Sequence, residues 1–507
     1  MSESALLSHC SDFGSGSMGG VGEENGGFRG HQQPKWFTPR RVLVLFCCIN
    51  LLNYLDRGTI ASNGVNGVPG DAGCKKDETC FHGSGIQGEF GLTYFQDGIL
   101  SSAFMVGLLA ASPVFAHLSK TLNPFRLIGV GLSVWVFATA GCGFSVGFWS
   151  ITTFRMLVGV GEASFVSLAA PFILDVAPPS QSSSWMSIFY MFIPVGVAMG
   201  YVYGGVVGGA LGWRAAFWIE SLLMLPFAVF GFVSDRIYLK GSLDKLQAIP
   251  QSDVEVADVP TADEVDSGVH ESLGGDDVNN KASALLPGGL LSDIKELAMS
   301  KVYTTNVLGY IVYNFVLGAY SYWGPKAGQA IFNMGNADEV FGGVTILAGI
   351  VGTYCGGRFL DYIGSSLRNS FKLLGVATAV GATGCFIAFM SQSLVAFIIL
   401  LAVGEFFLFA TQGPVNFVSL RSVNPNLQAL AMAMSTVCIH IFGDVPSAPL
   451  VGLFQDWVQN WRLTTLILTS IFYLAAAIWG AGVFFLGLDK ETGEAKESQE
   501  SPLLTQE

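Results

Sequence analysis

Residues 149–174 read WSITTFRMLVGVGEASFVSLAAPFIL. Only two side chains in this stretch, those of Arg155 and Glu162, are ionisable. A helix needs about 20 mostly apolar residues to cross the hydrocarbon layer of a bilayer, so this stretch is long and apolar enough to do so. Ionisable groups are costly at that depth and by default mark a functional or paired site. The stretch therefore predicts a membrane-spanning helix with charges inside it.

The rest of the chain repeats this apolar pattern. The 507 residues are 51% hydrophobic and 12% charged, whereas a soluble domain carries roughly twice that share of charge. We predict an all-α membrane protein with twelve transmembrane helices, arranged as two pseudo-symmetric six-helix bundles joined by a polar segment. The other eleven spans are expected near 42–62, 96–118, 126–147, 185–209, 215–234, 302–324, 339–358, 371–391, 393–420, 428–453 and 464–487.

A short motif occurs at equivalent places in the two halves. Gly212-Trp213-Arg214 precedes the sixth predicted span, and Asn460-Trp461-Arg462 precedes the twelfth. A single Trp-Arg pair could arise by chance. Its recurrence at equivalent positions suggests an internal duplication, which is the usual construction of secondary transporters.

Charge distribution predicts the orientation and the domain boundaries. Basic residues near the spans gather on one side, which the positive-inside rule makes cytosolic; they are Arg40, Arg41, Lys120, Arg126, Arg358, Arg368, Lys372 and Arg421. Much of the net charge of −13 lies in the polar central segment, and no basic nucleic-acid footprint is visible. The expected parts are a disordered cytosolic tail (1–38), an N-terminal bundle (39–235), a cytosolic acidic linker (236–300), a C-terminal bundle (301–488) and a cytosolic tail (489–507).

Charged residues inside the first and fourth spans are the main candidates for a transport site. Asp56 and Arg57 lie in the first span, either as site residues or as an interfacial ion pair. Arg155 and Glu162 are seven residues apart, about 10 Å along one helix face, so both can address one central cavity. The structural alternative is a buried pair that locks helices together, since Arg155 could equally bind Asp56.

The second half contains a smaller set of ionisable residues. Glu405 lies in the tenth span, and His440 and Asp444 are spaced i, i+4 on the eleventh. A His-Asp pair inside a membrane can relay protons near neutral pH, but we favour a structural hydrogen bond, because Pro446 and other helix-bending residues lie nearby.

Cys74 and Cys80 lie in the polar loop after the first span. They can form a disulfide if that loop faces an oxidising compartment, and they stay free otherwise.

Motifs of other chemistries are missing from the sequence. There is no phosphate-binding loop of the G-x-x-x-x-G-K-[ST] type, no H-E-x-x-H and no paired C-x-x-C with metal spacing. We therefore expect no ATP-driven transport, no enzymatic activity, no cofactor and no metal.

Several motifs resemble those of the major facilitator superfamily. "GGRFLDYIG" places Gly357, Asp361 and Gly364 in the spacing of the superfamily's loop motif, and "RMLVGVGEA" supplies a span-four pattern. The resemblance implies the major facilitator fold and a conformational gate at these loops. In the first half the corresponding run, "FAHLSKTLNPFR", has Lys120 where an acid is expected. The resemblance then implies a weakened or rearranged charge lock, with the fold unchanged.

Within that superfamily the chain is similar to the spinster family of sphingolipid and lysolipid transporters, plant-type members included. The similarity rests on "LNYLDRGTIA", "FRMLVGVGEASF", "GEFFLFATQGPVNFVSLRSVNP" and "HIFGDVPSAPLVGLFQD". It implies that Asp56, Arg57, Arg155 and Glu162 are the polar cavity residues, with Glu162 as the protonation site.

The expected function is transport of a sphingolipid or lysophospholipid by alternating access, with coupling to protons as a hypothesis. The alternatives are a carrier of a polar metabolite or organic anion and a lipid-sensing membrane protein that does not transport. We expect a monomer that binds no nucleic acid. Family similarity implies a late endosomal, lysosomal or vacuolar membrane, with the mitochondrial inner membrane and the plasma membrane as alternatives.

Overall fold

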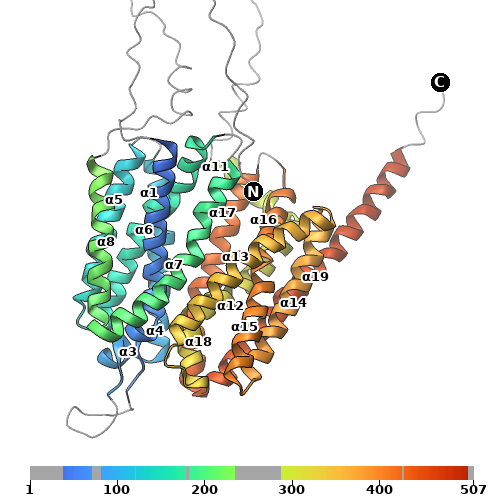
Figure 1. Cartoon of the computed structure of the whole chain (residues 1–507). Helices are drawn as coiled ribbons and strands as arrows, with labels where there is room; N and C mark the ends of the chain where they lie inside the picture. The colour runs from blue at the N-terminus through green and yellow to red at the C-terminus, as the bar shows by residue number, and fades with distance from the viewer. Residues whose placement is uncertain are drawn as a thin grey trace, which may run out of the picture.

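The computed structural model describes residues 38–70, 82–119, 122–178, 182–233, 287–424 and 427–500. Two groups of long helices stand side by side in Figure 1. The first group, the N-half, contains two short helices, α2 (Asn63–Asn66) and α3 (Gly85–Phe90), and six long ones: α1 (Pro39–Ala61), α4 (Tyr94–Leu118), α5 (Pro124–Gly143), α6 (Phe148–Val176), α7 (Ser182–Leu211) and α8 (Trp213–Val233).

The second group, the C-half, also contains six long helical segments. It follows α11 (Pro287–Met299), a helix within the predicted linker. Its spans are α12 (Lys301–Phe332), α13 (Ala337–Ile363), α14 (Leu367–Met390), α15 (Leu394–Phe409) with α16 (Gln412–Arg421), α17 (Gln428–Ile439) with η2 (His440–Asp444) and α18 (Val445–Val458), and α19 (Trp461–Glu500). The predicted fold class is confirmed.

One span is less apolar than the others. Eleven helices in the described ranges are long and apolar enough to cross a membrane, and α12 is not among them. It nevertheless packs along α19 within the C-half as the remaining spans do. The predicted span 302–324 ended too early, because α12 continues to Phe332 and takes the charged Lys326 into the protein interior.

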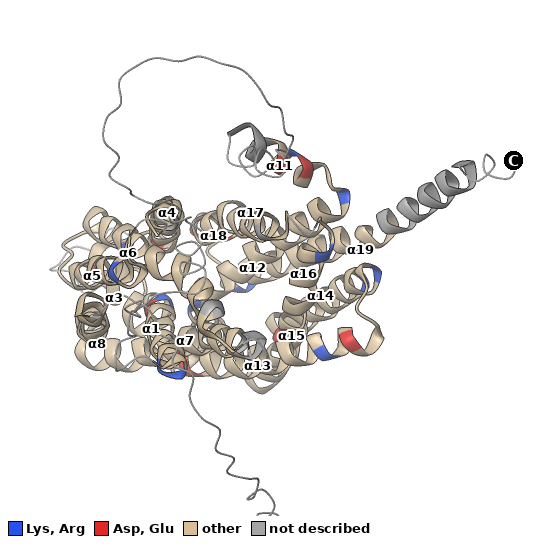
Figure 2. Ribbon diagram, turned by 90° about the horizontal axis from the view of Figure 1, so that it is seen from above, with Lys and Arg blue, Asp and Glu red and all other residues tan. Residues whose placement is uncertain are grey.

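Large apolar side chains face outward at mid-helix. Phe137, Leu222 and Leu347 are each about two-thirds exposed, which fits hydrocarbon as the surrounding solvent. In the view from above, blue and red residues are few among the tan helices (Figure 2). The outer surface is therefore suited to lipid, and the charged residues inside the bundles need internal partners.

Helix α1 packs against α7 along a row of glycines. A Cβ on Gly200 would lie 2.1 Å from the carbonyl oxygen of Leu55, and one on Gly58 would lie 2.0 Å from that of Val197. Only glycine permits this distance between backbones. The close approach positions the end of α1, which carries the charged residues, against the rest of the N-half.

The two halves are tied together on one side. We call the face where α1 begins the N-face and the other side the opposite face; the N-face is at the top of Figure 1. Asn63 donates to Asp338 of α13 at 3.0 Å, and the amides of Tyr94 and Phe95 donate to Asp456 of α18 at 2.9 Å. Hydrogen bonds between the halves, within the described residues, extend from the opposite face to about mid-depth.

Candidate functional site

Four charged side chains form two ion pairs between α1 and α6. Nη1 of Arg155 lies 2.8 Å from both carboxylate oxygens of Asp56, and Nη2 of Arg57 lies 2.5 Å from Oε1 of Glu162. Adjacent residues on a helix point about 100° apart, so Asp56 and Arg57 meet partners two turns apart on α6. The structure thus brings together all four residues singled out in the first half.

The two pairs differ in exposure. Asp56 and Arg155 are 0% and 1% exposed, whereas the side chain of Arg57 is 16% exposed above a fully buried Glu162. Arg57 also lies over the rings of Tyr54 and Phe104, at 4.4 and 4.7 Å from their centroids. The Arg155–Asp56 pair is the buried, helix-locking ion pair that the sequence left open as an alternative. Of the four side chains, Arg57 is the most exposed, so a bound molecule can reach it.

A second pair faces this group from the C-half. Nδ1 of His440 lies 2.6 Å from Oδ2 of Asp444, and these side chains are 23% and 15% exposed. They lie at the two ends of η2, a π-helical turn, and such turns often occur at functional sites. Asp444 is close enough to interact electrostatically with Arg57 and Tyr54 of the N-half. An acidic group of the C-half therefore lies within electrostatic range of a cation of the N-half.

Glu405 lies apart from these pairs. The hydroxyl of Thr345 donates to its Oε2 at 3.3 Å, and the residue is buried. Tyr201 and Tyr320 are its electrostatic neighbours. The structure does not bring Glu405 together with His440 and Asp444.

The candidate gate residues of the C-half lie where α13 ends at the N-face. Asp361 is exposed and accepts a hydrogen bond from Ser365 at 3.0 Å. Gly364 has a φ of 89° and ends the helix, while Gly357 lies against Gly413 of α16. The remaining candidates, Lys120, Cys74 and Cys80, lie outside the described residues.

Sequence reasoning missed a buried charge network at the opposite face. Nζ of Lys326 lies 2.6 Å from Asn66, 2.5 Å from Gln87 and 3.2 Å from Asp97, and Tyr322 donates to Asp97 at 2.9 Å. Lys326 belongs to the C-half and its three oxygen partners to the N-half. The sequence feature that could have revealed this network was Lys326 itself, which lies just beyond the predicted end of the span 302–324.

Sequence reasoning also missed Glu220, which is fully buried in α8. Its Oε1 is 2.5 Å from the hydroxyl of Thr59, and Asp56 is its charged neighbour. The available signal was an acid inside the apolar run "FWIESLLMLPF". The rule that selected Glu162 applies equally to it.

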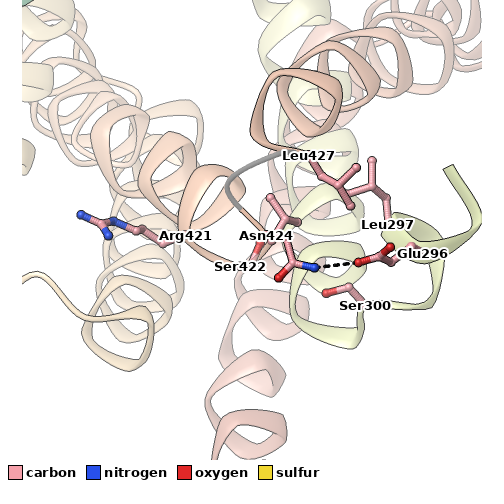
Figure 3. A pocket seen from close by; sticks show the side chains of 8 residues that line it. Glu296, Leu297, Ser300, Arg421, Ser422, Asn424 and Leu427 are labelled. Carbon is pink, nitrogen blue, oxygen red and sulfur yellow. Dashed lines mark hydrogen bonds between the residues drawn. The ribbon is translucent and has the colours of Figure 1, made fainter. Parts of the chain in front are cut away.

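Two pockets lie at the N-face, away from the ion pairs. One, of about 350 Å³, lies between α11 and the turn after α16; there Asn424 donates to Glu296 at 2.8 Å and Arg421 points away (Figure 3). The other, of about 390 Å³, is an apolar groove between α1 and α7 lined by Leu43, Trp185 and their neighbours. In the described part of the chain no three His, Cys, Asp or Glu side chains are grouped to hold a metal ion.

Two six-helix halves that meet around facing charged groups define a membrane transporter of the major facilitator class. The sequence profile of the Major Facilitator Superfamily matches residues 47–445. A protein of Arabidopsis thaliana named "Probable sphingolipid transporter spinster homolog 2" is 56% identical over 483 residues, covering 93% of this chain and 94% of that protein. The chain belongs to this superfamily and, within it, to the spinster family, as its motifs indicated.

More distant relatives extend the comparison. Human "Protein spinster homolog 1" is 26% identical, over 83% of this chain and 74% of the human protein. The crystal structure of a bacterial homolog of the human lysosomal transporter spinster, inward-facing and unoccupied, has a TM-score of 0.67 and 16% identity over 88% of this chain and 97% of that one. A nucleoside transporter has a TM-score of 0.63 at 12% identity, over 87% of this chain and 99% of that one. These two structures support the fold alone.

Proposed function

We propose that this protein transports sphingolipids or lysophospholipids across a membrane by alternating access, coupled to protons. The names of its plant relatives support the substrate class. The observation that carries the proposal is that Arg57, the most exposed member of the two central ion pairs, lies within electrostatic range of Asp444 of the C-half.

The facing charges suit the head of a single-chain amphipathic lipid. A guanidinium binds phosphate oxygens with paired, charge-assisted hydrogen bonds, so Arg57 takes the anionic part of the head. Asp444, with His440 beside it, takes the ammonium. One head then contacts both halves, and its differential affinity shifts the equilibrium between their arrangements.

Glu162 supplies the link to protons. Arg57 can bind either Glu162 or the anion of the lipid head, because both compete for the same guanidinium. A proton on Glu162 removes that competitor and frees Arg57 for the head. Proton binding and lipid binding are then coupled through a single side chain.

The hydrogen bonds between the halves support alternating access. They lie from the opposite face to about mid-depth, so this conformation is closed at that face. The cycle requires these contacts to part while the halves close at the N-face. The basic residues at the N-face, Arg40 and Arg41 among them, make that face cytosolic by the positive-inside rule.

The test is flux of a labelled sphingoid lipid or lysophospholipid through purified full-length protein in proteoliposomes, with and without a pH gradient. Wild type is expected to accumulate lipid under the gradient, and Glu162→Gln to lose that accumulation. Glu339→Gln is the matched control, because it makes the same chemical change at an exposed position on the opposite face. Accumulation by Glu162→Gln at the wild-type level would reject Glu162 as the coupling site, and lack of lipid flux in wild type would favour a polar-metabolite carrier.

We also propose a monomer in a late endosomal or vacuolar membrane. The chain belongs to the spinster family, and human spinster is described as a lysosomal transporter; this family membership supports the compartment. Fluorescent tagging of the full chain in plant cells with vacuolar, mitochondrial and plasma-membrane markers tests the location. Co-localisation with a mitochondrial marker alone would overturn it.

A further inference from the structure

We propose that Glu220 of α8 binds a transported proton. The site consists of Glu220, Thr59 and the Asp56–Arg155 pair, all of them buried. It extends the proposed function, and rests on it, by adding a proton site to the one assigned to Glu162.

The balance of charges leaves one carboxyl group without a cation. Asp56 is paired with Arg155, and Glu162 is paired with Arg57. Glu220 shares the interior of the N-half with these pairs and has no basic partner of its own among the described residues. A buried carboxylate beside a second carboxylate is strongly disfavoured, and such a group takes up a proton instead.

The hydrogen-bond donors lead to the same assignment. The hydroxyl of Thr59 has one proton and lies 2.9 Å from the carbonyl oxygen of Leu55 and 2.5 Å from Oε1 of Glu220. If Glu220 were ionised, both neighbours would be acceptors competing for that proton. A protonated Glu220 resolves the conflict, because it donates to Thr59 while Thr59 donates to Leu55.

Four helices supply a titratable or charged neighbour to Glu220. These are Asp56 from α1, Arg155 from α6, Cys142 from α5 and Tyr203 from α7. Arg155 is the single cation in this set, and both oxygens of Asp56 already contact it. Ionised Glu220 would therefore compete with Asp56 for Arg155.

This competition gives the proton a mechanical effect. When the O–H bond of the Glu220 carboxyl breaks and its proton passes to water, the new carboxylate draws Arg155 away from Asp56. The contact between α1 and α6 then loosens. Since α1 also carries Arg57, release of the proton changes the helix that holds the lipid head. Glu220 is seven residues from the start of α8, so it lies about 10 Å from the opposite face.

Infrared spectroscopy of the full-length protein at neutral pH tests for the proton. Wild type is expected to show a carboxylic-acid C=O band with a component that shifts in D2O and is lost in Glu220→Gln. Ser221→Ala is the control, because this neighbour on α8 donates to the carbonyl of Val136 outside the ion pairs. A band unchanged in Glu220→Gln overturns the proposal.

Thr59→Val provides a second variant in case Glu220→Gln does not fold. A protonated Glu220 loses its acceptor there, so its band is expected to move to higher wavenumber. An unshifted band overturns the proposal, because an ionised Glu220 contributes nothing to that band.

Lipid flux in proteoliposomes separates a transported proton from a static one. Glu220→Gln, which stays permanently neutral like the protonated form, is expected to lose accumulation driven by a pH gradient while some exchange of labelled lipid remains. Loss of the band with normal accumulation would overturn Glu220 as a transported-proton site and leave the proposed function intact. Failure of wild type to accumulate lipid would reject proton coupling itself, whereas the infrared band would still report the proton on Glu220.

Discussion

Asp56 and Arg57 are adjacent on α1, but they have different roles because their side chains differ in burial. Asp56 is fully buried against Arg155, whereas Arg57 remains partly accessible against Glu162. A closed pair serves the packing of α1 on α6, and an accessible pair can be opened by a ligand. Substitutions in the buried pair should therefore first lower stability, whereas substitutions in the accessible pair should first impair binding of the lipid head.

Asp56→Asn is expected to destabilise the protein strongly. It leaves Arg155 buried without a counter-charge, and breaking a buried pair in this way costs on the order of 3–5 kcal/mol. Thermal unfolding in detergent, followed by size-exclusion chromatography, measures the loss. The double variant Asp56→Leu with Arg155→Met should regain much of the stability, and a single variant as stable as wild type would refute the structural role of the pair.

Glu89 and Arg214 form an ion pair at the opposite face that should respond to acid. The hydrogen bond from Arg214, together with one from Trp213, lowers the pKa of Glu89 below its usual value. A lowered pKa means that the contact stabilises the fold above the ordinary range of a glutamate, near pH 4.3, and is lost as the pH falls through the lowered value.

The size of that effect should be small. The two side chains are 31% and 44% exposed, so solvent screening limits the contribution to about 0.5 kcal/mol or less. Glu89→Gln should lower the melting temperature slightly at neutral pH, and the difference should vanish in acid. A difference that grows in acid would contradict the sign of this argument.

Which charged residues matter was partly readable from the sequence, but their pairing was not. An acid or a base inside an apolar run stands out locally, as Glu162 did. Its partner is set by which helices pack together, and α1 and α6 are separated by about a hundred residues. Lys326 was not predicted to be buried, because the residues that compensate its charge belong to the other half of the chain. Glu220 was readable by the same rule and was overlooked.

At the scale of whole elements, the Trp-Arg motifs do equivalent work in the two halves. Arg214 donates to the carbonyl of Ser145, just beyond the end of α5, at 3.0 Å. Arg462 donates to the carbonyl of Ser391, just beyond the end of α14, at 2.9 Å. Each arginine thus satisfies carbonyls at a helix end. The repeated Trp-Arg motif, which suggested duplication, therefore makes the same kind of hydrogen bond at a helix end in both halves.

The glycine row between α1 and α7 yields an element-scale prediction. Gly200→Ala places a Cβ 2.1 Å from the carbonyl oxygen of Leu55, so the two helices must separate. We expect a loss of stability of roughly 1–3 kcal/mol, as for overpacking, and reduced lipid flux because α1 carries Arg57. Gly209→Ala on the same helix is the control, since open space surrounds that position. Equal melting temperatures of the two variants would argue against close packing as the reason for glycine.

At the scale of the whole molecule, Lys326 is a central tie between the halves. Its ammonium group reaches three oxygens of the N-half from a helix of the C-half. These groups are buried while the halves are closed at the opposite face, and opening there would expose them to water. An unpaired Asp97 is therefore more costly in the closed arrangement than in the open one.

Lys326→Met should consequently shift the protein toward opening at the opposite face. Spin labels at Val146→Cys of the N-half and Trp457→Cys of the C-half, both highly exposed near that face, report the separation. In a background without other reactive cysteines, we expect Lys326→Met to add a population at longer distance. Lys301→Met, at the exposed N-face end of the same helix, is the control and should leave the distances unchanged. If both variants give the wild-type distribution, Lys326 does not hold the halves together, and the tie must come from the contacts of Asp338 and Asp456, since these also join the two halves.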